Sequence, residues 1–97
     1  MDLQTKANVL IVDDKPENLL ALETVLADLG QNLVRASSAR EALRSLLLDD
    51  FALILLDVQM PGLNGFELAE LIRERKNKVR IRIVLFNFFL YLPQLNG

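Results

Sequence analysis

The apolar positions of this 97-residue chain fall into short continuous runs that alternate with stripes at helical spacing. Two unbroken runs, Val9–Val12 and Phe51–Leu56, are typical of strands that are buried on both faces of a parallel sheet. Asn32–Ala36 is predicted to form a shorter strand between them. Each of these runs is followed by a stretch with helical periodicity. The pattern therefore predicts strand, helix, strand, helix, strand and helix in succession.

Three helices are predicted from this periodicity and from their end signals. The first begins at Pro16, where a missing N–H costs nothing, and stops near Gly30. The second follows Ser38, which forms an S-x-x-E capping box with Glu41, and the third ends in the basic run Arg73–Lys78. The apolar positions that repeat at helical spacing are Leu19, Leu22, Val25, Leu26 and Leu29 in the first helix, Ala39, Ala42, Leu43, Leu46 and Leu47 in the second, and Leu68, Ala69, Leu71 and Ile72 in the third.

This alternation predicts one α/β domain over residues 1–97, a doubly wound parallel sheet with right-handed crossovers. The segment after the third helix has a different character. Residues 80–83 alternate Arg and Ile, as an edge strand does, and Val84–Leu92 is apolar except for Asn87. We expect a fourth strand that continues into an apolar tail. The tail is shorter than the roughly twenty residues needed to span a bilayer.

Charge is distributed unevenly along the chain, although the net charge is only −2. Residues 1–72 carry 5 basic and 12 acidic side chains, whereas residues 73–97 carry 6 basic and 1 acidic. A basic run is most often a solvated helix end, and no aromatic platform is interleaved with this one, so direct nucleic-acid binding is not expected. The amino terminus lacks the pattern of a signal peptide. We expect a cytoplasmic protein without a membrane segment.

Acidic residues end two of the predicted strands. Asp13 and Asp14 follow the apolar run Val9–Val12, and Asp57 follows the run Phe51–Leu56. Because the carboxyl ends of parallel strands meet at one edge of a sheet, these three carboxylates are expected to converge. The chain has no histidine or cysteine, so a cation held there would have oxygen ligands, which favours Mg²⁺. An Asp beside such an ion can act as a nucleophile and accept a phosphoryl group.

Other interpretations of the same residues remain open. Acidic side chains at strand ends are often solvated loop residues, or charges that the N-terminus of a helix favours. Asp49 and Asp50 are expected to be such a surface pair at the opposite end of the sheet. Met60 and Phe66 are expected to pack rather than to contact a ligand. A phosphatase that turns over substrates is disfavoured, because no general base is present besides the carboxylates.

The segments VLIVDD and LILLDVQMPGLNGFEL, some forty residues apart, resemble the receiver domain of two-component response regulators, the CheY-like fold. The resemblance covers about Val9 to Arg75. It implies strand order 2-1-3-4, with the family's fifth strand missing or supplied by another chain. It also implies that Asp57 takes a phosphoryl group from a phosphohistidine on a sensor histidine kinase or phosphotransfer protein. Asp14 would ligate Mg²⁺ directly, Asp13 through water, and Gln59 through its backbone carbonyl.

The chain departs from the family pattern after residue 75. Members usually carry a Ser or Thr at the end of the fourth strand and a Lys at the end of the fifth, but no Ser or Thr follows Ser45 and no Lys follows Lys78. Asn87 lies near the expected place of the hydroxyl and is a possible substitute at that switch position. A truncated or altered reading frame is one explanation of residues 76–97.

Two functional hypotheses follow from the motifs and the departures together. The first is a phosphoacceptor module that binds Mg²⁺ and is not a turnover enzyme. The second is a degenerate or truncated receiver that acts in dimerisation or protein interaction without effective phosphoryl switching. In either case the apolar segment 79–92 predicts a homodimer or higher self-association, because an exposed apolar edge tends to acquire a partner.

Overall fold

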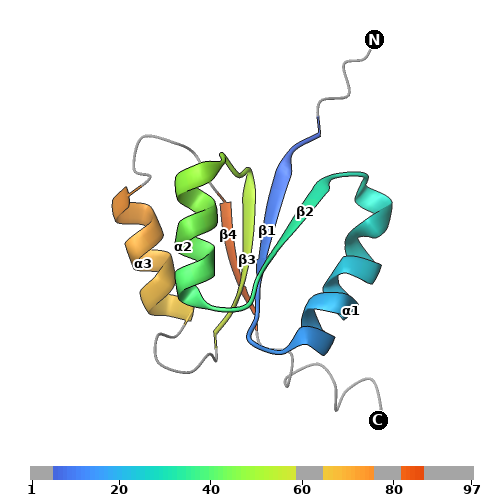
Figure 1. Ribbon diagram of the computed structural model, residues 1–97, viewed down its shortest axis with the longest axis horizontal. Coiled ribbons are helices and arrows are strands. Elements are labelled where there is room, and N and C mark those ends of the chain that lie inside the picture. Colours follow the sequence, from blue (N-terminus) through green and yellow to red (C-terminus); the bar gives the residue numbers. More distant parts are fainter. Residues whose placement is uncertain (1–5, 59–64, 76–81, 87–97) are drawn as a thin grey trace.

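A four-stranded parallel sheet lies between helices in the computed structural model, which describes residues 6–58, 65–75 and 82–86 (Figure 1). The strand order is β2-β1-β3-β4, and every neighbouring pair is parallel. The doubly wound architecture predicted from the sequence pattern and the order 2-1-3-4 implied by the family resemblance are confirmed. The elements are β1 (Asn8–Val12), α1 (Pro16–Leu26), the short 3₁₀ helix η1 (Ala27–Leu29), β2 (Asn32–Ala36), α2 (Ala39–Leu48), β3 (Leu53–Asp57), α3 (Gly65–Arg75) and β4 (Arg82–Phe86).

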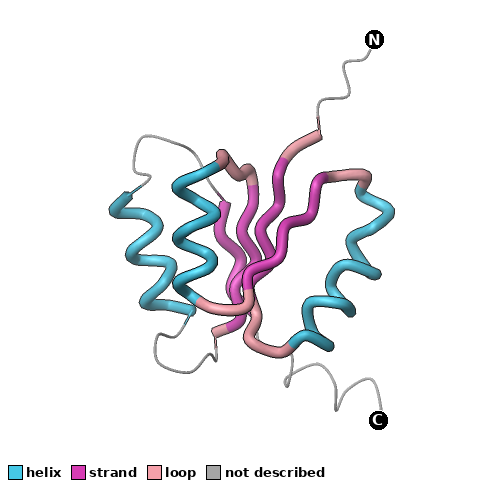
Figure 2. Tube along the Cα trace, viewed as in Figure 1, coloured by secondary structure: helices cyan, strands magenta, loops and turns pink. Residues whose placement is uncertain are grey.

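The sheet is covered by helices on both faces. Figure 2 shows α1 on one side of the strands and α2 and α3 on the other. Within the described ranges, no helix has the length and apolar character needed to cross a bilayer.

The two central strands, β1 and β3, bury side chains on both faces, as their continuous apolar sequences predict. Successive side chains of a strand point to opposite faces, so each strand contributes to two separate apolar clusters. The cluster on the α1 side is formed by Val9, Ile11 and Leu19, with the partly buried Leu22, Leu26, Leu33, Leu53 and Leu55. The larger cluster under α2 and α3 contains Leu10, Val12, Ala36, Ala42, Leu46, Phe51, Ile54, Leu56, Leu68, Ala69 and Ile72.

Not every apolar position of these helical stripes is buried. Val25, Leu29 and Leu47 are 74%, 56% and 72% exposed. Only a stripe of about 100° on a helix can face a sheet, and Val25 lies about 120° around α1 from Leu19. Leu29 belongs to η1, after α1 has ended. The predicted third strand also begins too early, since Phe51 is buried but precedes β3.

The helix ends follow the predicted signals, with one difference. Ser38 Oγ accepts a hydrogen bond from the Glu41 N–H at 3.1 Å, which is half of the predicted capping box. The Glu41 carboxylate, however, accepts from the N–H of Ser37 at 2.8 Å rather than from that of Ser38. At the other predicted end signal, Gly30 adopts φ +69° and its N–H donates to the Ala27 carbonyl at 3.2 Å.

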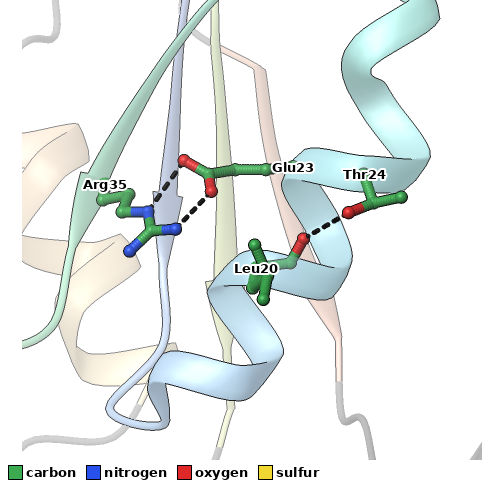
Figure 3. A network of polar contacts seen from close by, with 4 residues as sticks. All are labelled: Leu20, Glu23, Thr24 and Arg35. Carbon is green, nitrogen blue, oxygen red and sulfur yellow. Dashed lines mark hydrogen bonds and ion pairs between the residues drawn. The ribbon is translucent and has the colours of Figure 1, made fainter.

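An ion pair joins α1 to the outer strand β2 (Figure 3). Arg35 donates from Nε to Glu23 Oε2 at 2.7 Å, and its Nη2 donates to the other carboxylate oxygen. This two-point contact with Arg35 lowers the pKa of Glu23 below its ordinary value of 4.5.

Glu23→Gln should therefore change how stability depends on pH. A carboxyl group whose pKa is lower in the folded chain stabilises it above the unfolded value and loses that contribution as the pH falls through the folded value. We expect Glu23→Gln to lower the melting temperature slightly at neutral pH and to match the wild type well below pH 4.5. Thermal melts across this range test it. A difference that is the same at every pH would contradict the ion pair.

Candidate functional site

Two of the predicted acidic residues lie side by side because the register of the sheet brings them together. In the parallel pairing of β1 with β3, Val12 lies beside Leu56. Asp13 and Asp57 are the next residues along the two strands, at the carboxyl edge of the sheet. This edge is the lower one in Figure 1. The loop that follows β1 lies there too, and this loop carries Asp14. Asp49 and Asp50, the predicted surface pair, are exposed.

Asp13, Asp14 and Asp57 form one acidic cluster. Each offers a carboxylate oxygen, and these oxygens lie within 4.8 Å of one another. Asp13 and Asp57 are 0% and 4% exposed, and Asp14 is partly buried. Carboxylates that are simply solvated at a loop would not be buried together in this way, because ionised groups lose hydration on burial. The geometry therefore favours a cluster that attracts a cation.

The Asp13 carboxylate is held at both of its oxygens. Oδ1 accepts from the Lys15 N–H at 3.0 Å, and Oδ2 accepts from Asn18 Nδ2 at 3.0 Å. Burial raises the pKa of Asp13 above its ordinary value of 3.8 and the charges of Asp57 and Asp14 add to this, although the two hydrogen bonds oppose it. Without a cation, the ionisation of Asp13 therefore destabilises the fold as the pH rises above 3.8.

Asp14 supplies an oxygen that fits a metal ligand. Its Oδ1 is buried and has no hydrogen-bond partner among the described residues, although the Lys15 ammonium forms an ion pair with it at 3.8 Å, which is too long for a hydrogen bond. A buried carboxylate oxygen left in this way is costly unless a cation occupies its free side. Two oxygens bound to one Mg²⁺ at about 2.1 Å lie at most about 4.2 Å apart. The three oxygens, which lie within 4.8 Å of one another, are therefore close to the spacing that a bound cation requires.

Gly65 brings the start of α3 directly against the backbone of Asp57. Its N–H donates to the Val58 carbonyl at 3.3 Å. A Cβ at this position would lie 2.6 Å from the Asp57 carbonyl oxygen and 2.8 Å from Val58 Cα. A glycine in a loop can allow the backbone to approach a ligand closely. At Gly65 the close approach is instead to the protein's own main chain.

The remaining predicted residues of the site are not all open to description. Gln59, Met60 and Asn87 lie outside the described residues. Phe66 was expected to pack, but its side chain is 60% exposed. Gly65 faces the backbone of Asp57, and Phe66, the next residue of α3, faces outward. The sequence analysis missed Asn18, a buried amide beside Asp13, since its only signal is its place in the first turn of the helix that follows this carboxylate.

Comparison with known proteins places the chain in a family. The family model for the response regulator receiver domain matches residues 9–86, which includes β4. The chain is 41% identical over 66 residues to the sensor histidine kinase GacS of Pseudomonas protegens, a match that covers 68% of this chain and 7% of GacS. It is thus similar to a small part of a much longer kinase.

Solved structures show the same fold. The response regulator TrrA of Thermotoga maritima, in complex with Mg²⁺ and BeF, is 25% identical, with a TM-score of 0.74 and 95% of each chain covered. TrrA in complex with the histidine kinase ThkA gives a TM-score of 0.73 at 26% identity, with 95% of this chain and 97% of that chain covered. The fold and the acidic edge define a CheY-like module of two-component signalling. The chain belongs to the response regulator receiver domain family.

Proposed function

We propose that this receiver domain binds Mg²⁺ through Asp13, Asp14 and Asp57 and accepts a phosphoryl group on Asp57. The observation that carries the proposal is the buried cluster itself, in which one carboxylate oxygen from each of Asp13, Asp14 and Asp57 lies within 4.8 Å of the other two. A sensor histidine kinase or phosphotransfer protein is the proposed donor, and the complex of TrrA with ThkA supports this. In this proposal residues 1–97 act as one receiver-like domain in the cytoplasm. The domain accepts a phosphoryl group and does not turn over substrates.

The proposed reaction is an in-line displacement at phosphorus. A carboxylate oxygen of Asp57 attacks the phosphorus atom, the P–O bond to the aspartate forms, and the P–N bond of the donor phosphohistidine breaks. The electron pair of that bond returns to the imidazole. Bound Mg²⁺ would neutralise the negative charge that otherwise repels the phosphoryl oxygens from the acidic cluster. Asp14 would hold the ion directly and Asp13 through water.

Two further residues belong to the proposal on the strength of the family resemblance. Gln59 lies two residues after Asp57 in the sequence, and its backbone carbonyl would be an additional Mg²⁺ ligand. Asn87 would replace the hydroxyl residue at the switch position. Phe86 lies beside Asp57 in the pairing of β3 with β4, and Asn87 is the next residue in the sequence.

Intact-mass spectrometry of the wild-type chain with acetyl phosphate tests the proposal. The donor's P–O bond breaks and acetate leaves, so each reacted chain gains one phosphoryl group. We expect one group per chain with Mg²⁺ and almost none when the metal is chelated. A folded chain that gains no phosphoryl group with Mg²⁺ present would contradict the proposal and leave a receiver fold without its chemistry.

We also propose that the chain self-associates through residues 79–92, of which 82–86 are described. Among the described strands, β4 lies at an edge of the sheet, and Val84 on this strand is 47% exposed. An edge strand with an exposed apolar side chain favours pairing with another strand, and a charge at such a position opposes it. Light scattering after size-exclusion chromatography should show a dimer or larger species for the wild type, and a shift toward the monomer for Val84→Lys. A wild type that remains monomeric at about 100 μM would contradict this.

A further inference from the structure

Asn18 is a buried amide at the start of α1 that faces the acidic cluster. The side chain is 8% exposed, and its Nδ2 donates to Asp13 Oδ2 at 3.0 Å in a buried hydrogen bond. A carboxylate can only accept, so the NH₂ group of the amide must be the part that faces it. Asn18 occupies the third position of α1, after Pro16 and Glu17. The position of the helix therefore determines where this donor lies.

The second donor to Asp13 comes from the same turn of chain. The Lys15 N–H binds Oδ1 at 3.0 Å, and the Asn18 N–H in turn donates to the Lys15 carbonyl at 3.1 Å. With one donor on each oxygen, the plane of the Asp13 carboxylate is fixed. The Lys15 donor is a backbone group that any residue except proline would supply, whereas the donor at position 18 depends on the side chain.

Asn18 is also a neutral donor. A lysine or arginine in its place would neutralise part of the charge that attracts a cation, and an apolar residue would leave Asp13 Oδ2 buried without this hydrogen bond. An amide orients the carboxylate and leaves the full negative charge of the cluster in place. Groups that hydrogen-bond to metal ligands commonly change metal affinity by 10–100-fold when they are removed.

We propose that Asn18 is a positioning residue of the Mg²⁺ site, which holds the Asp13 carboxylate in the orientation that its contact with the ion through water requires. The inference rests on the proposed function, since it needs an ion at the cluster. Asn18 does not touch the reacting atoms in this proposal. It acts through Asp13. The hydrogen bond already restricts the rotation of the Asp13 carboxylate in the metal-free chain, so less conformational entropy is lost when the ion binds.

The test is a titration with Mg²⁺ alone, read as heat of binding and as the rise in melting temperature with metal concentration. We expect Asn18→Leu, which has a similar volume but no donor, to weaken Mg²⁺ binding by up to about 10-fold, because Asp13 contacts the ion through water. Asn18→Gln, which keeps an amide donor, should recover most of the affinity. If Asn18→Leu does not fold, Asn18→Ala replaces it, with weaker binding expected in the same direction.

Leu22→Ala is the matched control, because Leu22 lies on the same helix and packs in the α1-side cluster away from the carboxylates. It should lower the melting temperature of the metal-free chain and leave the affinity for Mg²⁺ unchanged. Suppose that an Asn18 variant without the amide donor folds and still binds Mg²⁺ as tightly as the wild type. That result would overturn the role of Asn18 but not the proposed metal site. A wild type that shows no response to Mg²⁺ would overturn the proposed metal site, and the inference with it.

Discussion

Asp57→Asn is expected to abolish phosphoryl incorporation from acetyl phosphate. The amide has nearly the shape of the carboxylate, so the fold should remain, but an amide oxygen is a far weaker nucleophile than an ionised carboxylate. The neighbouring carboxylates are assigned other roles in the proposal, Asp14 to hold the ion directly and Asp13 through water, so neither is expected to replace Asp57 as the nucleophile. Intact-mass spectrometry with Mg²⁺ present should show no adduct on the variant under conditions that modify the wild type fully.

Two matched variants separate the nucleophile from its surroundings. Asp14→Asn keeps Asp57 but removes the carboxylate whose buried oxygen has no hydrogen-bond partner in the part of the chain that the structure describes, so phosphorylation should slow by about 100-fold or more if metal binding is lost. Asp49→Asn makes the same chemical change at an exposed position outside the cluster and should react like the wild type. An adduct on Asp57→Asn as abundant as on the wild type would show that another residue accepts the phosphoryl group.

Gly65→Ala is expected to destabilise the fold strongly, although it adds a single methyl group. The new Cβ would lie 2.6 Å from the Asp57 carbonyl oxygen and 2.8 Å from Val58 Cα. Both atoms belong to the main chain at the end of a buried strand, so the first turn of α3 must move away. We expect a cost of about 2–3 kcal/mol, which corresponds to a fall of roughly 10–20 °C in melting temperature for a domain of this size.

Gly30→Ala provides the contrast for this prediction. Gly30 has φ +69° but no atom within 4 Å of an added Cβ, so the substitution costs only the strain of the left-handed conformation, about 1 kcal/mol. Thermal melts of the two variants compare a steric contact with a backbone preference. Equal melting temperatures for Gly65→Ala and the wild type would contradict the close packing of α3 against Asp57.

Much of the fold could be predicted from the sequence because its patterns are local. The runs Val9–Val12 and Phe51–Leu56 are apolar throughout, as strands covered on both faces must be, and they supply most of the central strands β1 and β3. The acidic residues Asp13, Asp14 and Asp57 could be grouped because parallel strands end at one edge. The exposed positions Val25 and Leu47 could not be predicted, because helical spacing alone does not show how wide the contact with the sheet will be.

The sequence by itself determined the class of fold, the order of its elements and the identity of the three carboxylates, since these depend on periodicity and on which residues end the strands. Only the tertiary structure decided that Gly65 packs on the Asp57 backbone and that Asn18 holds Asp13. Both contacts join residues from different elements, and their distances follow from how α1 and α3 lie against the ends of the strands. No local pattern encodes that arrangement, because it results from the burial of the two apolar clusters on opposite faces of the sheet.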